Sequence, residues 1–242
     1  MIQIKKHIPN TITCLNLISG CVAITYALIG EPQWALLWII IGATFDFFDG
    51  LSARLLGVSS SIGKELDSLA DDITFGVAPA AIVAYELSVI DYPALLEPYR
   101  GYIPYFAFII AAFSALRLAK FNLDERQTTS FIGLPTPANA LFWGSFIIGA
   151  KYQIENCEWA LPALLIMVCV SSWLLVCELP MFALKFKQWG WKGNEIRYSF
   201  IALCSLIFAA FIYAYGLGGI LYSFWIVIVA YILISIIQWL RS

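Results

Sequence analysis

Four aspartates in the first third of the chain have the spacing of side chains that share a helix face. Asp46 and Asp49 are three residues apart, and Asp67 and Asp71 are four residues apart. Residues at these intervals lie on one side of a helix. Two antiparallel helices joined by a short polar turn would bring the four carboxylates together, so the sequence predicts one acidic site.

Protonation or salt bridges could relieve the repulsion in such a site, but bound cations are the more economical answer. A carboxylate buried alone in a membrane costs a few kcal/mol, and the nearby Arg54 and Lys64 are too few to pair with all four. Oxygen-only ligands suit hard divalent ions, and two such ions can polarise a phosphoryl oxygen and stabilise a leaving phosphate. We therefore predict that the four aspartates hold hard divalent ions such as Mg²⁺, Mn²⁺ or Ca²⁺, two of which could serve a phosphoryl-transfer reaction.

Small residues between the two pairs favour this functional interpretation. A lone aspartate pair at a helix end is usually a solvated cap or an ion-pair partner. Here Gly50, Ala53 and Gly63 separate the pairs, and small side chains let a bulky ligand or a second backbone approach closely.

The composition is that of a membrane protein. Of 242 residues, 61% are hydrophobic and 12% are charged, whereas a soluble domain is nearer half apolar and a quarter charged. The net charge of −2 gives no basic excess for nucleic acid. We predict a single integral-membrane domain over residues 1–242, with a catalytic core at about 9–180 and two additional helices within about 197–240.

Eight apolar segments are each near the length that crosses about 30 Å of hydrocarbon. They are too long for barrel strands and do not alternate, so the predicted fold is an all-α polytopic helix bundle with about eight transmembrane helices. The segments cover residues 11–30, 33–56, 65–87, 101–121, 133–151, 159–179, 197–216 and 218–240.

Basic residues gather on one side of this topology, which predicts that both termini and the acidic site face the cytoplasm. The other side would hold only Arg100 and Lys151. The expected location is the cell (plasma) membrane, with membrane lipids as partners. The cytoplasmic side would hold Lys5, Lys6, Arg54, Lys64, Arg117, Lys120, Arg126, Lys185, Lys187, Lys192, Arg197 and Arg241.

The acidic region resembles the signature of the CDP-alcohol phosphotransferases. Eight fixed residues match over 26 positions, with the spacing Asp46-x2-Asp49-Gly50-x2-Ala53-Arg54-x8-Gly63-x3-Asp67-x3-Asp71. The resemblance implies that the aspartates hold two metal ions, with Asp71 also the base that deprotonates an acceptor alcohol. It further implies that the family reaction releases CMP, and that the CDP pocket is lined by Gly50, Ala53, Arg54 and Gly63.

Residues 63–80, 117–122 and 131–138 resemble the phosphatidylserine synthase branch, which implies CDP-diacylglycerol and serine as substrates. Arg117 and Lys120 could bind the serine carboxylate, or could equally be snorkelling membrane anchors. Asn122 and Thr136 could add hydrogen bonds to the acceptor. Glycerol-3-phosphate and inositol phosphate remain rival acceptors.

The segment before the first apolar run is similar to the opening segment of the family. Thr13 and Asn16 could approach the nucleotide, while Asn10 or Thr11 could instead cap the first helix. No cysteine or histidine is placed at the motif, so direct attack by the alcohol is expected. The resembled family also makes a homodimer possible.

Two interpretations from other classes compete with an enzyme. A divalent-cation transporter could use the aspartates as an ion path, but it predicts sites near the bilayer midplane and repeated halves. The acids here cluster near one end of their segments, and no repeat is visible. A purely structural membrane protein would leave the matched spacing unexplained.

Overall fold

The computed structural model describes residues 2–58, 60–124, 131–184, 188 and 190–241, and these are mostly helical. Arg126, Lys185 and Lys187, which were counted toward the charge bias, lie outside the described residues. The helices are α1 Ile2–Leu28, α2 Pro32–Leu56, α3 Ser61–Asp71, the π-helix η1 Asp72–Val77, α4 Ala78–Val89, the 3₁₀-helices η2 Glu97–Tyr99 and η3 Ile103–Phe108, α5 Ile109–Leu123, α6 Thr136–Gly149, α7 Lys151–Glu155, α8 Ala160–Val176, α9 Glu195–Tyr215 and α10 Gly219–Arg241.

Within the described residues, six helices are long and apolar enough to cross a membrane, so the chain is an all-α membrane protein. They are His7–Leu28, Pro32–Leu56, Ser61–Val89, Ile103–Leu123, Glu195–Tyr215 and Gly219–Arg241. The two other expected spans correspond to α6, with 14 residues, and α8, with 17 residues, which are shorter than the roughly 20 residues that span a bilayer.

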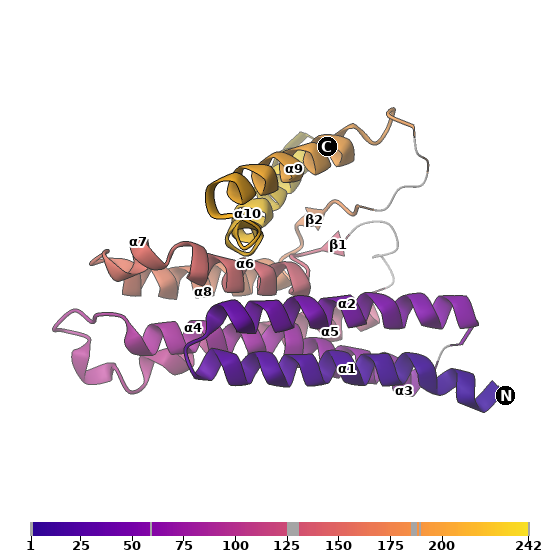
Figure 1. Ribbon diagram of the computed structural model, residues 1–242, viewed down its shortest axis with the longest axis horizontal. Coiled ribbons are helices and arrows are strands. Elements are labelled where there is room, and N and C mark those ends of the chain that lie inside the picture. The colour runs from indigo at the N-terminus through magenta and orange to yellow at the C-terminus, as the bar shows by residue number, and fades with distance from the viewer. Residues whose placement is uncertain (1, 59, 125–130, 185–187, 189, 242) are drawn as a thin grey trace.

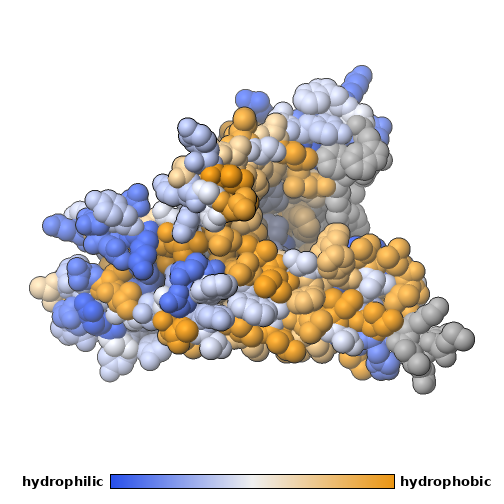
Figure 2. Space-filling model, viewed as in Figure 1, coloured by the Kyte–Doolittle hydropathy of each residue, from blue (hydrophilic) through white to orange (hydrophobic). Residues whose placement is uncertain are grey.

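The helices of the first 180 residues lie roughly alongside one another, and α9 and α10 lie together above them in the view of Figure 1. Apolar residues cover much of the visible face (Figure 2). Polar residues gather at the end that carries α7 and the loop after α4. This distribution agrees with helices that cross an apolar layer and end in polar surroundings.

Turn residues set where the first helices end. Gly57 ends α2 in the left-handed conformation (φ 60°), and its N–H donates to the carbonyl groups of the last turn, as is common for glycine after a helix. Ser60 then caps α3, because its hydroxyl accepts the Gly63 N–H at 3.0 Å. The four aspartates therefore lie on either side of one short turn.

The start of the first helix was wrongly placed. Asn10 and Thr11 were candidate N-caps, but α1 begins at Ile2 and continues through Pro9. The Thr11 hydroxyl donates to the His7 carbonyl at 2.8 Å, within the helix. Proline removes one backbone donor, and the helix continues past that single loss.

A π-helical turn in the third span was not anticipated. The Ala78 N–H donates to the Ile73 carbonyl, five residues back. The next residue, Pro79, has no N–H to donate to an α-helical partner. Single π turns of this kind occur frequently at functional sites, and this one follows Asp71 directly.

Close helix contacts surround the side chain of Thr74 in this turn. A Cβ placed at Gly20 of α1 would lie 2.5 Å from Thr74 Oγ1, and one at Gly42 of α2 would lie 2.6 Å from Thr74 Cγ2. Neither position has room for a larger side chain. The three helices that carry the acidic site are thus held at short range just beneath it.

The C-terminal helices join this core mainly through α10. The Trp225 N–H donates to Ser145 Oγ of α6 at 3.0 Å, and the Tyr231 hydroxyl donates to the Phe182 carbonyl at 2.9 Å. Two short antiparallel strands, β1 Phe131–Ile132 and β2 Pro180–Met181, connect the segments before α6 and after α8.

Candidate active site

Three of the four aspartates that the sequence was expected to bring together meet at one end of the bundle. Asp46, Asp49 and Asp67 each offer a carboxylate oxygen, and these three oxygens lie within 4.8 Å of one another. Asp49 is buried, and Asp46 and Asp67 are half-buried. We call these three residues the aspartate triad.

The triad has the donor set of a hard divalent ion. Oxygens that share one such ion lie at most about 4 to 5 Å apart, because each metal–oxygen bond is about 2.0 to 2.6 Å. Without an ion, two charges at 4.8 Å repel by about 3 kcal/mol at an effective dielectric constant of about 20. Among the described residues, no lysine or arginine forms an ion pair with the triad or with Asp71. The arrangement therefore fits bound divalent metal.

Asp71 lies outside the triad and has its own support. Asn16 Nδ2 donates to Asp71 Oδ1 at 3.1 Å, and Asn16 is fully buried. The Asn16 carbonyl in turn accepts the Thr74 hydroxyl at 3.0 Å. Asp71 Oδ2 has no hydrogen-bond partner within the described part of the chain, so one carboxylate oxygen is fixed and the other can accept a proton.

Thr13 gives the triad a second link to α1. Its hydroxyl lies 2.5 Å from Asp49 Oδ2 and 3.0 Å from the Pro9 carbonyl. One hydroxyl proton serves only one acceptor at a time. When the Thr13 hydroxyl donates its hydrogen bond to Asp49, it orients a metal ligand. Hydrogen bonds of this kind usually surround metal sites.

A cavity of about 250 Å³ adjoins the triad. Four of the residues expected to contact nucleotide line it: Thr13, Gly50, Ala53 and Gly63. Two others do not. Arg54 is exposed beside Gly50, with its Nη1 atom 3.7 Å from where a Cβ at that glycine would lie, and Asn16 instead contacts Asp71.

The sequence interpretation missed part of this lining. Pro9, Asn10, Val58, Ser60 and Lys64 also line the cavity. A signal was present in the sequence, since Pro9 and Thr13 are four residues apart and Asn10 and Thr13 are three apart, so one helix face carries all three. It was obscured because Asn10 was considered as a helix cap.

The acceptor candidates divide into two kinds of environment. Arg117 is buried, its Nε donates to the Leu134 carbonyl at 2.8 Å, and its guanidinium lies 5.5 Å from the Phe121 ring centroid. Its charge also interacts with that of Asp71. Within the described residues, its two Nη groups make no hydrogen bond, so they are available to an anionic ligand.

The remaining candidates mostly hold helices together. Asn122 Nδ2 donates to Ser68 Oγ at 2.7 Å, and the Asn122 carbonyl accepts Lys64 Nζ at 2.9 Å. Lys120 is exposed, with Nζ 3.5 Å from a carbonyl oxygen of α8. Thr136 is buried at the first position of α6. None of these candidates lines the 250 Å³ cavity.

Comparison with known proteins gives a consistent result. The sequence profile of the CDP-alcohol phosphatidyltransferase family matches residues 6–186. A Bacillus subtilis protein named CDP-diacylglycerol–serine O-phosphatidyltransferase is 40% identical over 175 residues, covering 72% of this chain and 89% of that protein. Proteins of the same name from Mycobacterium leprae (31% identity, 93% of this chain, 72% of that protein) and Saccharomyces cerevisiae (36%, 62% and 55%) also match.

The matched region contains the aspartate triad, Asp71 and the adjoining cavity. The chain is therefore a membrane-bound transferase that belongs to the CDP-alcohol phosphatidyltransferase family.

Proposed function

We propose that this protein transfers the phosphatidyl group of CDP-diacylglycerol to the hydroxyl of L-serine, giving phosphatidylserine and CMP. The observation that carries this proposal is the aspartate triad beside a cavity lined by small residues. The names of the similar proteins support serine as the acceptor. Because the chain belongs to a transferase family, the transporter alternative has no supporting observation.

The triad aspartates would hold two divalent ions, with Asp71 as a further ligand. When bound, the metal neutralises the diphosphate and stabilises the leaving phosphate. The serine oxygen attacks the phosphorus bonded to diacylglycerol, the bond to the CMP oxygen breaks, and the serine proton passes to Asp71. Asn16 fixes Asp71 Oδ1, which leaves Oδ2 to take up that proton. For this step, Oδ2 must lie within hydrogen-bond reach of the serine hydroxyl.

The substrates would approach this centre from two directions. The nucleotide would occupy the cavity lined by Thr13, Gly50, Ala53 and Gly63, and the exposed Arg54 would swing over it. Buried Arg117 would bind the serine carboxylate through its free Nη groups, since a planar guanidinium pairs well with a carboxylate. Lys120, Asn122 and Thr136 would shape the acceptor side.

We further propose that the helices cross the plasma membrane eight times, with α6 and α8 completing the set. Both termini and the active site would face the cytoplasm, and the whole chain would be one domain. A homodimer is compatible with this arrangement. Cysteine accessibility at each end of the bundle, measured in intact cells, would test the orientation.

The decisive experiment is CMP release by the purified protein in detergent, with CDP-diacylglycerol, Mn²⁺ or Mg²⁺, and one alcohol at a time. We expect release that requires serine and is lost in Asp71→Asn. Release with glycerol-3-phosphate or inositol phosphate instead would keep the family chemistry and reject serine. Metal uptake into liposomes without CMP release would reject the enzyme.

A further inference from the structure

A second cavity lies at the opposite end of the bundle from the aspartates. It has a volume of about 220 Å³ and lies between the α1–α2 turn and the ends of α4 and α6. Glu86, which lines it, is fifteen residues after Asp71 along nearly continuous helix, or about 22 Å at 1.5 Å per residue. The cavity is therefore separate from the transferase site.

Glu86 is a buried carboxylate that lines this cavity without a close partner. Only 5% of its surface is exposed. No hydrogen bond to its side chain and no ion pair within 4.0 Å links it to any described residue. Burial of a charged group is costly unless it is paired, so this position requires a cation or a proton donor.

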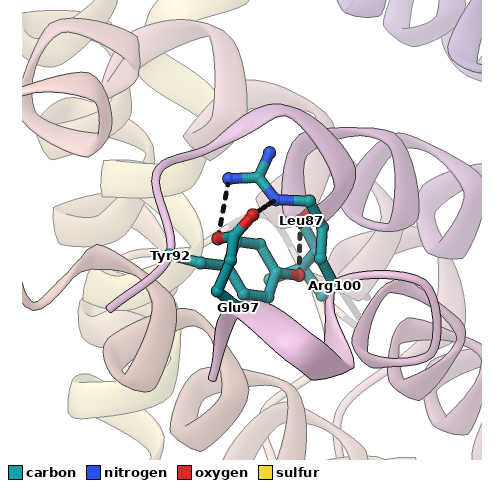
Figure 3. A network of polar contacts seen from close by, with 4 residues as sticks. All are labelled: Leu87, Tyr92, Glu97 and Arg100. Carbon is teal, nitrogen blue, oxygen red and sulfur yellow. Dashed lines mark hydrogen bonds and ion pairs between the residues drawn. The ribbon is translucent and has the colours of Figure 1, made fainter. Parts of the chain in front are cut away.

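Arg100, one of the two cations assigned to this end, is engaged elsewhere. Arg100 Nε lies 3.0 Å from Glu97 Oε1, and the guanidinium lies 4.7 Å from the Tyr92 ring centroid (Figure 3). The Tyr92 hydroxyl is fixed by the Leu87 carbonyl at 2.8 Å. This network holds Arg100 on the loop after α4.

Lys151 is the only other cation that the charge distribution assigned to this end. Its Nζ atom lies 3.9 Å from Glu155 Oε1, and both side chains are more than half exposed. Lys151 and Glu155 also line the cavity, and both interact electrostatically with Glu86. Two carboxylates and one ammonium leave the cavity with a net charge of −1, and Lys151 is loosely held at its mouth.

We propose that this cavity binds a small zwitterion that carries a primary ammonium group and a phosphate, as in ethanolamine phosphate. Glu86 accepts hydrogen bonds from the ammonium, and Lys151 meets the phosphate. The volume of about 220 Å³ is below the roughly 300 to 1,000 Å³ of pockets for larger ligands. A ligand of headgroup size therefore fits this cavity.

Tyr85 and Gly30 shape one side of the cavity. Tyr85 lines the cavity, and its ring and hydroxyl lie so close to Gly30 that a Cβ there would collide with them. Gly30 has a φ of +78° and forms the turn between the first two spans. The cavity thus lies where membrane helices end, at the level where lipid headgroups are found.

The same chemistry could come from a lipid or from a free compound, and binding measurements on the purified full-length protein distinguish them. Native mass spectrometry would compare retention of phosphatidylethanolamine, phosphatidylcholine and phosphatidylglycerol, and calorimetry in detergent would test free ethanolamine phosphate. Glu86→Gln keeps the side-chain shape and removes the charge. Glu158→Gln, an exposed acid outside the cavity at the same end, is the control.

We expect preferential binding of the ethanolamine compound, weakened about tenfold or more in Glu86→Gln because a buried charge-assisted hydrogen bond is lost. The Glu158→Gln protein should bind like the original protein. Binding only of the lipid, or only of the free compound, identifies the source. CMP release should be unchanged in Glu86→Gln. The binding result can therefore be interpreted even if the transferase proposal fails.

Equal retention of the three lipids by the original protein and by Glu86→Gln, with no heat from the free compound, would overturn the proposal. Lys151→Met addresses the purely structural alternative. If Lys151 serves only to neutralise Glu86, both variants would shift the unfolding temperature and leave ligand binding unaltered, which also overturns it.

Discussion

Asn16 should control the position of the reactive carboxylate without touching the nucleotide. Its side chain is fully buried and donates to Asp71 Oδ1 at 3.1 Å. A hydrogen bond to a charged group contributes about 1.5 to 3 kcal/mol, and each 1.36 kcal/mol changes a rate about tenfold. We therefore expect Asn16→Ala to lower kcat by about 10- to 150-fold while the KM for CDP-diacylglycerol stays within about twofold, because Asn16 does not line the cavity.

The assay is CMP release as a function of each substrate at saturating Mn²⁺. Asn16→Asp gives a sharper version, since it keeps the shape but replaces the donor with a like charge beside Asp71, and its kcat should fall further. Asn156→Ala is the control, because within the described residues that amide donates only to the Tyr152 carbonyl, in the short helix α7 just before it. A large rise in the KM for CDP-diacylglycerol at unchanged kcat would refute the reasoning and make Asn16 a nucleotide contact.

Three further predictions follow from the same geometry. Asp67→Asn replaces one of the three clustered carboxylates by a neutral amide and should weaken Mn²⁺ binding at least about tenfold by calorimetry; unchanged affinity would exclude the triad as the metal site. Arg117→Ala should raise the KM for serine about tenfold or more and spare that for CDP-diacylglycerol; an unchanged serine KM would remove Arg117 from the acceptor site. Gly20→Ala places a Cβ 2.5 Å from Thr74 Oγ1 and should cost about 1 to 3 kcal/mol of stability, seen as a lower unfolding temperature, whereas Gly101→Ala, with open space around it, should not.

Length and apolar character were enough to predict the helices but not their ends. The last two expected segments, 197–216 and 218–240, correspond to α9 and α10, which a short turn separates. The start of α1 was not predicted, because Pro9 resembles a helix boundary, although a long helix tolerates one missing donor. The π turn was not predicted either, because it results from Pro79 together with packing against two other helices.

Spacing along one helix predicted the aspartate cluster, since periodicity is a local property. The partners of those aspartates depend on tertiary packing. Asn16 and Asp71 are 55 positions apart, so no repeat or motif interval relates them. Arg117 illustrates the opposite limit. Its residue type suited either a membrane anchor or a carboxylate ligand, and only its burial and its hydrogen bond to Leu134 distinguish a fixed guanidinium from a snorkelling one.

The first helix, α1, contacts both the metal site and the proposed base. Thr13 and Asn16 are three residues apart on one face of α1, and each contacts the second aspartate of a pair, Asp49 and Asp71. A small shift of α1 along its axis would therefore move a metal ligand and the proposed base together. Because Gly20 sets how closely α1 approaches the π turn, Gly20→Ala should lower Mn²⁺ affinity and kcat jointly, whereas a defect in folding alone would lower the fraction of active protein and leave the affinity of that fraction unchanged.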